Sequence, residues 1–112
     1  MTRRPVFLGD LELMVLLVIL HLGEDAYAVP IRQALADRAG RQIARGALYT
    51  TLERLEAKGY LRSRFGDPTP ERGGRSRRYF SVSARGLAVL RTSYDALRGL
   101  SEGLETILGR TP

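Results

Sequence analysis

Apolar residues dominate the first part of the chain and predict its central helix. The run over residues 13–20 is almost uninterrupted, which is typical of a helix covered on most sides rather than of a surface helix. We therefore expect a buried helix over residues 8–22. Gly23 should close it, because a left-handed glycine commonly ends a helix.

A shorter apolar stripe predicts a second helix over residues 30–39. Pro30 fits its first turn, where the missing N–H costs nothing, and a residue that precedes proline, here Val29, favours an extended backbone. Gly40 should stop this helix. Its inward stripe is expected to be Ile31 and Leu35.

A third predicted helix, residues 45–58, has two contrasting faces. Leu48, Leu52 and Leu55 fall on one narrow stripe and should be buried. The other face carries small, hydroxyl-bearing or cationic side chains, which allow close approach to another molecule, while free N–H groups at the helix start favour phosphate. An ordinary amphipathic helix with a packed tyrosine is the alternative. The candidate contact residues are Arg45, Gly46, Ala47, Tyr49, Thr50 and Arg54.

Alternating residues predict a two-stranded hairpin, with strands over residues 60–66 and 77–82. Its apolar side is expected to carry Leu61, Ser63, Phe65, Phe80 and Val82. The connecting loop is rich in glycine and arginine, so it should project as a basic tip that follows a phosphate backbone or enters a minor groove. A loop whose charge is incidental is the alternative. The candidate contacts here are Arg62, Arg64, Arg72, Arg75, Arg77 and Arg78.

Three helices followed by a basic hairpin predict a winged helix-turn-helix, a mainly α fold with a two-stranded β-hairpin. In that fold the third helix enters the major groove of DNA and the wing lies over the adjacent backbone. We expect residues 1–82 to form this DNA-binding domain. Arg54 and Thr50 are the better candidates for base edges, whereas Tyr49 and the arginines of the hairpin should mainly anchor phosphates.

Leucines at alternating three- and four-residue spacing predict a C-terminal dimerisation helix over residues 83–112. It should begin at Ser83 and run for roughly 25 residues, nearly 40 Å, which exceeds what so small a domain needs for its own core. A two-fold partner is the usual solution, and folding back onto the same domain is the alternative. The expected seam is Leu87, Leu90, Tyr94, Leu97, Leu104 and Leu108, with Ser101 as its polar position.

The net charge of +6 strengthens the nucleic-acid interpretation because it is localised. The whole basic excess falls between Arg38 and Arg78, and such a localised basic segment implies a polyanionic partner. The alternative is a basic surface that is merely solvated. The chain has no Cys and one His, so we expect no metal site and no cofactor. Without a catalytic triad or a phosphate-cradling loop, we expect no enzyme.

The amino terminus superficially resembles a secretory signal, with Arg3 and Arg4 before the apolar run. Asp10 and Glu12 interrupt the flank, and the run is well short of the roughly 20 apolar residues that span a bilayer. We therefore expect a cytoplasmic protein without membrane association. A basic adaptor for acidic proteins or membrane surfaces, without sequence-specific DNA binding, is the competing function.

Several stretches together resemble the short subgroup of the PadR family of bacterial transcriptional regulators, over nearly the whole chain. They are residues 8–12 (LGDLE), 22–27 (LGEDAY), 46–56 (GALYTTLERLE), 70–75 (PERGGR) and 78–80 (RYF). The resemblance implies a homodimeric repressor that binds a partly palindromic, double-stranded operator and is often released by a small aromatic or planar effector. It carries Tyr49 and its neighbours over as operator contacts and residues 72–78 as the wing contact.

Two positions depart from the family pattern. The residue two before Gly46 is commonly a hydroxyl amino acid that caps the third helix, and here it is Ala44. The small residue after Tyr27 is commonly glycine, and here it is Ala28. An effector would fit between the dimerisation helix and the first helix, where Tyr94 and Phe7 are candidate aromatic walls, although core or seam packing explains both as well.

Overall fold

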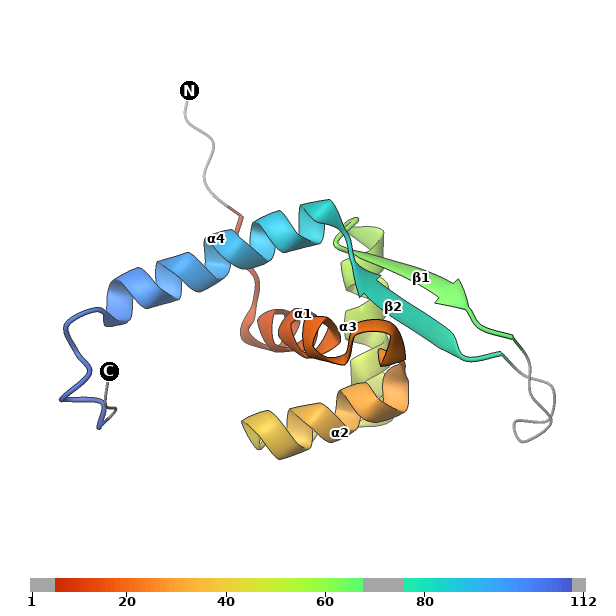
Figure 1. Ribbon diagram of the computed structural model, residues 1–112, viewed down its shortest axis with the longest axis horizontal. Helices are drawn as coiled ribbons and strands as arrows, with labels where there is room; N and C mark the ends of the chain where they lie inside the picture. Colours follow the sequence, from red (N-terminus) through yellow and green to blue (C-terminus); the bar gives the residue numbers. More distant parts are fainter. Residues whose placement is uncertain (1–5, 68–75, 110–112) are drawn as a thin grey trace, which may run out of the picture.

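A computed structural model describes residues 6–67 and 76–109. Figure 1 shows helices gathered around a central helix, with a hairpin projecting from one side. The mainly α fold with one two-stranded hairpin, predicted from the sequence, is confirmed. The elements are α1 (Asp10–Leu22), the 3-10 turn η1 (Gly23–Asp25), α2 (Ala28–Ala39), α3 (Arg45–Ala57), β1 (Leu61–Phe65), β2 (Arg78–Val82) and α4 (Ala84–Ser101).

The hydrophobic core forms where α1 meets the other helices and the hairpin. Val15 and Leu16 of α1 are fully buried, whereas Leu17 and Leu20 are exposed, so the central helix has one uncovered edge. The stripes expected on the second and third helices are confirmed, because every member is fully buried. These residues are Ile31, Leu35, Leu48, Leu52 and Leu55.

α2 begins two residues earlier than predicted, and the expectation of an extended Val29 was wrong. Tyr27 is the N-cap, with an extended backbone, and its carbonyl accepts the first helical hydrogen bond from the Ile31 N–H at 3.1 Å. Pro30 therefore occupies the third helical position. Its nitrogen still needs no partner there, because the first turn of a helix leaves its N–H groups without intrahelical acceptors.

The hairpin is anchored to the helices along both strands. β1 and β2 are antiparallel, with Leu61 opposite Val82 and Ser63 opposite Phe80. The Phe80 N–H also donates to the Ala26 carbonyl at 2.8 Å, which ties β2 to the segment between η1 and α2. Phe65, expected on the apolar side, is 69% exposed, because the strands continue past the helices that cover their first residues (Figure 1).

α4 is shorter than predicted. It ends at Ser101, and residues 102–109 form turns that include Gly103 with φ of 85°. Its 18 residues correspond to about 27 Å of helix, and both Leu104 and Leu108 lie beyond its end. The leucine spacing continues beyond Ser101, although the glycines in this part of the chain disfavour a helix. Leu90, expected in the seam, is buried in the chain's own core.

The first turn of α4 is fixed to the start of the hairpin. As predicted, Ser83 caps the helix, its Oγ accepting from the Gly86 N–H at 3.0 Å and donating to the Gly59 carbonyl at 2.6 Å. The Ser83 N–H donates to the Tyr60 carbonyl at 3.0 Å. Gly86 packs directly on the Tyr60 backbone, where a Cβ would lie 2.1 Å from the carbonyl oxygen.

The described residues also bear on two other kinds of site, a membrane-spanning helix and a cluster of metal ligands. Within residues 6–67 and 76–109, no helix combines the length and apolar character needed to cross a membrane. The same residues contain no cluster of three or more potential metal ligands.

Candidate nucleic-acid interface

The exposed face of α3 is small and polar, as expected for a helix that approaches another molecule. Gly46, Ala47, Thr50 and Arg54 are all exposed, and nothing lies within 4 Å of where a Gly46 side chain would begin. The Thr50 hydroxyl donates to the Gly46 carbonyl at 3.0 Å, so its remaining capacity toward solvent is that of an acceptor. Arg54 forms no ion pair within the described parts of the chain.

The first turn of α3 offers uncapped N–H groups. Ala44 is the N-cap, with an extended backbone and no side chain that could accept a hydrogen bond. The Arg45 guanidinium lies 5.9 Å from the centre of the Tyr49 ring. The helix start therefore combines free donors with a cation held beside an aromatic ring, an arrangement that favours a phosphate group.

Two tyrosines flanked by two arginines form a second surface, which we call the arginine–tyrosine ridge: Arg64, Tyr79, Tyr27 and Arg77. Arg64 stacks over Tyr79 at 4.6 Å and Arg77 over Tyr27 at 4.2 Å, each measured to the ring centre. The two rings meet edge to face at 5.6 Å. Each guanidinium thus rests on an aromatic face, which restricts its motion. Arg64 is exposed, and Arg77 is half-buried.

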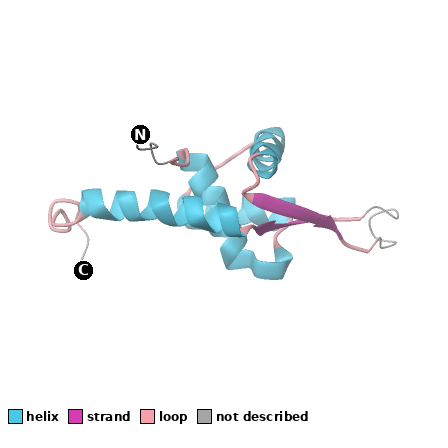
Figure 2. Ribbon diagram, turned by 90° about the horizontal axis from the view of Figure 1, so that it is seen from above, coloured by secondary structure: helices cyan, strands magenta, loops and turns pink. Residues whose placement is uncertain are grey.

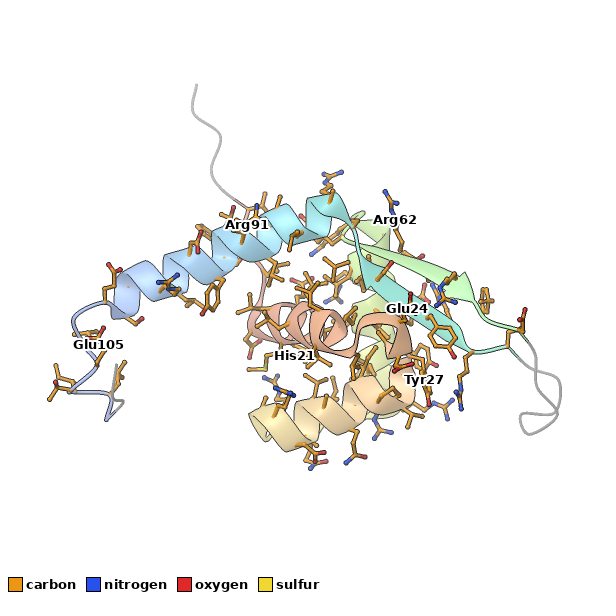
Figure 3. The ribbon with its side chains drawn as sticks, in the orientation of Figure 1. His21, Glu24, Tyr27, Arg62, Arg91 and Glu105 are labelled. Carbon is orange, nitrogen blue, oxygen red and sulfur yellow. The ribbon has the colours of Figure 1, made fainter. Side chains whose placement is uncertain are left out.

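The ridge continues toward the exposed face of α3. A shallow hollow of about 200 Å³ is lined by residues from the start of α2 and the start of α3, among them Tyr27, Arg32, Arg45 and Tyr49. Figure 3 shows Tyr27 at the junction of α2 and the hairpin. The structure therefore brings Arg45, Tyr49, Arg64 and Arg77 to one connected surface.

Arg78 has a different place from its neighbour Arg77. Its guanidinium pairs with the carboxylates of Glu53 and Glu56 on α3 and lies 5.0 Å from the centre of the Phe80 ring. The hydrogen bond from Arg78 to Glu53 raises the pKa of Arg78 further above its usual range. Because Arg78 fixes the hairpin to α3, it is not among the proposed DNA contacts.

Two other members of the basic segment are also paired within the chain. Arg41 contacts Asp10 at 2.9 Å, and its hydrogen bond lowers the pKa of that carboxyl group. Lys58 contacts Glu12 at 3.0 Å. The outward positive charge is therefore concentrated in fewer residues than the sequence suggested.

The remaining predicted contacts lie apart from the ridge or outside the described residues. Arg62 is exposed on β1, and in Figure 3 it points away from the side on which Tyr27 lies. Arg72 and Arg75, expected at the tip of the wing, fall outside residues 6–67 and 76–109. Their role stays a prediction.

Glu12 gives the fold a dependence on acid pH. Burial opposes its ionisation, but hydrogen bonds from Lys58 and from the Gly9 N–H outweigh burial and lower its pKa. A carboxyl group whose pKa is lower in the folded state stabilises the fold at pH values above its unfolded pKa. This stabilisation is lost as the pH falls through the folded pKa.

We expect Glu12→Gln to lower the free energy of unfolding by about 0.5 kcal/mol at neutral pH, since the pair is partly solvated. The difference from the parent should shrink as the pH falls through the lowered pKa of Glu12. Urea unfolding at neutral and at acidic pH measures it, and a difference that persists undiminished in acid would show that the Glu12 charge is not its source.

Sequence reasoning missed Tyr27 and Tyr79 as site residues. Both were part of recognisable stretches, but their contact joins positions far apart in the chain. The available signal was local: Tyr79 lies two residues after Arg77 and so on the same side of an extended strand, and arginine is the cation that stacks most often on aromatic rings.

Comparisons with known proteins show which family the chain resembles. A family model described as the transcriptional regulator PadR-like family matches residues 16–92. A curated protein of Lysinibacillus sphaericus is 30% identical over 92 residues, covering 80% of each chain.

Solved structures resemble the chain over most of its length. A regulator described as PadR family from Eggerthella lenta is 33% identical, with a TM-score of 0.65 over 88% of this chain and 87% of that one. A PadR-like transcription factor from Bacteroides fragilis is 28% identical, with a TM-score of 0.69 over 88% and 90%. A Clostridium difficile regulator shares the fold at 18% identity, with a TM-score of 0.72 over 89% and 99%.

Proposed function

The chain belongs to the PadR-like family of transcriptional regulators, and from that premise we propose that it is a homodimeric repressor that binds one operator and is released by a small molecule. The observation that carries the proposal is the exposed face of α3, with its small and polar side chains, beside the arginine–tyrosine ridge. A helix of this kind fits a major groove while the ridge follows the adjacent phosphates.

Individual roles follow from side-chain chemistry. We assign base-edge contacts to Arg54 and Thr50, both exposed on α3, Arg54 with a bidentate guanidinium and Thr50 with a hydroxyl acceptor. Gly46 and Ala47 permit close approach of the helix. The phosphate contacts are assigned to Arg45, Tyr49, Arg64 and Arg77, with Arg62, Arg72 and Arg75 kept as predictions.

An uncovered apolar stripe on α4 supports the homodimer. Val89 and Leu90 bury the first half of the stripe against the domain, while Leu97 and Leu100, which continue it, are 53% and 78% exposed. Figure 2 shows why: this end of α4 extends beyond the body, opposite to the hairpin. A second copy related by a two-fold axis would cover both stripes at once.

The proposed effector site adjoins this stripe. A hollow of about 370 Å³ lies between α4 and the segment before α1, and its lining includes Phe7, Leu13, Leu97 and Leu100. An effector there would favour one arrangement of the two subunits over another. It would release DNA only if it binds the non-binding arrangement more tightly.

Selection of bound duplexes from a random pool tests the proposal. We expect an inverted repeat with half-sites about 34 Å apart, because two recognition helices of a dimer face successive major grooves. Equal retention of the selected and a scrambled duplex at physiological salt would contradict sequence-specific binding and favour an adaptor for acidic partners.

Arg77 and Arg78 provide a matched pair for testing the phosphate role of the ridge. Arg77→Gln should flatten the slope of log K against log salt by about 0.9 for each phosphate that the variant no longer neutralises, because fewer counterions are released on binding. Arg78→Gln removes the same charge from the next position. It should leave the slope nearly unchanged, because Arg78 is paired with two carboxylates.

The measurement is operator affinity by fluorescence anisotropy across a salt series, with folding of both variants verified by circular dichroism. Equal flattening by the two substitutions would indicate a general effect of net charge and would refute the assignment of Arg77 to a phosphate.

A further inference from the structure

A second cavity lies away from the dimer stripe, between the end of α1 and the hairpin. Its volume is about 400 Å³, within the range of small-molecule sites. One wall comes from α1 and η1 and the other from β1 and β2. The lining residues are Ile19, Leu20, Gly23, Glu24, Arg64, Tyr79, Phe80, Ser81 and Val82.

Opposite charges line the two walls of this cavity. Arg64, on the strand side, stacks over the Tyr79 ring at 4.6 Å and forms no ion pair with any residue that the structure describes. Glu24, on the helical side, is exposed and lies beside the hairpin in Figure 3. A guanidinium held on an aromatic face is oriented to receive a carboxylate in a bidentate manner.

Apolar side chains supply much of the remaining wall, together with the polar Ser81. Leu20 is 47% exposed at the cavity, although it belongs to the central helix of the fold. Ile19 is buried behind it, and Val82 completes the apolar surface from β2. Covering exposed apolar surface in a cavity with a ligand is favourable, because it removes that surface from water.

We propose that this cavity binds a small α-amino acid with an apolar side chain. The ligand carboxylate pairs with Arg64, its ammonium group with Glu24, and its side chain covers Leu20. Because Arg64 also belongs to the arginine–tyrosine ridge, a bound amino acid competes with DNA phosphate for this guanidinium. The competition, unlike the binding itself, rests on the proposed function.

The zwitterion is favoured over simpler ligands by the balance of charge. An apolar acid satisfies Arg64 but brings no partner for Glu24, and an apolar amine does the reverse. A polar ligand leaves the leucine surface in water. Only a molecule with both charges and an apolar group matches all three features of the wall.

Titration calorimetry on the protein without DNA tests the site. We expect saturable binding of L-phenylalanine, with 3-phenylpropanoate and 2-phenylethylamine at least tenfold weaker because each lacks one charge. Arg64→Gln and Glu24→Gln should each weaken L-phenylalanine at least tenfold. Arg62→Gln on the same strand and Asp25→Asn beside Glu24 do not line the cavity and should bind it like the parent.

Two results would overturn the site. One is the absence of saturable heat with L-phenylalanine and L-leucine for a parent protein that is folded by circular dichroism. The other is an affinity for L-phenylalanine that 3-phenylpropanoate equals, or that the Arg64→Gln and Glu24→Gln substitutions do not change.

A second titration with the selected operator duplex tests the competition. Saturating L-phenylalanine should lower operator affinity of the parent and have no effect on Arg64→Gln. If L-phenylalanine binds but operator affinity stays constant, the competition is refuted while the site stands. If no duplex is selected at all, the proposed function fails and the calorimetric result is unaffected.

Discussion

Gly86→Ala is expected to lower the free energy of unfolding by about 3 kcal/mol, or to prevent folding. A methyl group at this position would lie 2.1 Å from the Tyr60 carbonyl oxygen and 2.9 Å from the carbonyl carbon. These are backbone atoms, so no change of rotamer relieves the clash, and either α4 or the start of β1 must shift. The shift would also disturb the Ser83 cap.

Gly99→Ala in the same helix is the matched control. No atom lies within 4 Å of its added methyl group, so alanine should stabilise the helix by up to about 1 kcal/mol through its higher helix propensity. Urea unfolding monitored by circular dichroism compares the two variants with the parent. Similar midpoints for Gly86→Ala and the parent would show that the close approach to Tyr60 is not a constraint.

Leu97→Glu is expected to convert the proposed dimer into a monomer and to lower operator affinity by about 100-fold or more. Leu97 continues the buried stripe of α4 into solvent, so a carboxylate there would be buried without a partner in the dimer. A monomer engages one half-site at a time and loses the effective concentration that linkage provides.

Arg91→Gln provides the control, since it lowers the net charge by the same amount. Arg91 is exposed on α4 and points away from α1 in Figure 3. Sedimentation measures the mass of each variant, and anisotropy measures operator binding. A Leu97→Glu protein that remains dimeric would place the subunit interface elsewhere.

Periodicity predicted the parts of the fold that depend on local spacing. Leu48, Leu52 and Leu55 lie on one helical face whatever surrounds them, so their burial follows once the helix packs at all. The end of α4 could not be found in this way. Leu104 and Leu108 continue the repeat, but both are exposed in the part of the chain that the structure describes, so burial does not offset the low helix propensity of Gly103.

The DNA interface itself stays a prediction, but the structure separates its candidate residues into paired and unpaired cations. Strand alternation already places Arg77 and Arg78 on opposite faces of the hairpin. It does not show that one face meets Glu53 and Glu56 while the other meets Tyr27, because these contacts join segments far apart in the chain. Local charge density therefore overestimated the number of free cations in this segment.

The union of α4 with the hairpin has a mechanical consequence. At Gly86 the helix packs on the Tyr60 main chain with no side chain between them. No change of side-chain rotamer at this contact can therefore accommodate a tilt of the helix. An 18-residue helix acts there as a lever of about 27 Å. A force that a neighbouring subunit applies to the C-terminal end of α4 would therefore be transmitted to the start of β1. The hairpin would tilt together with the helix.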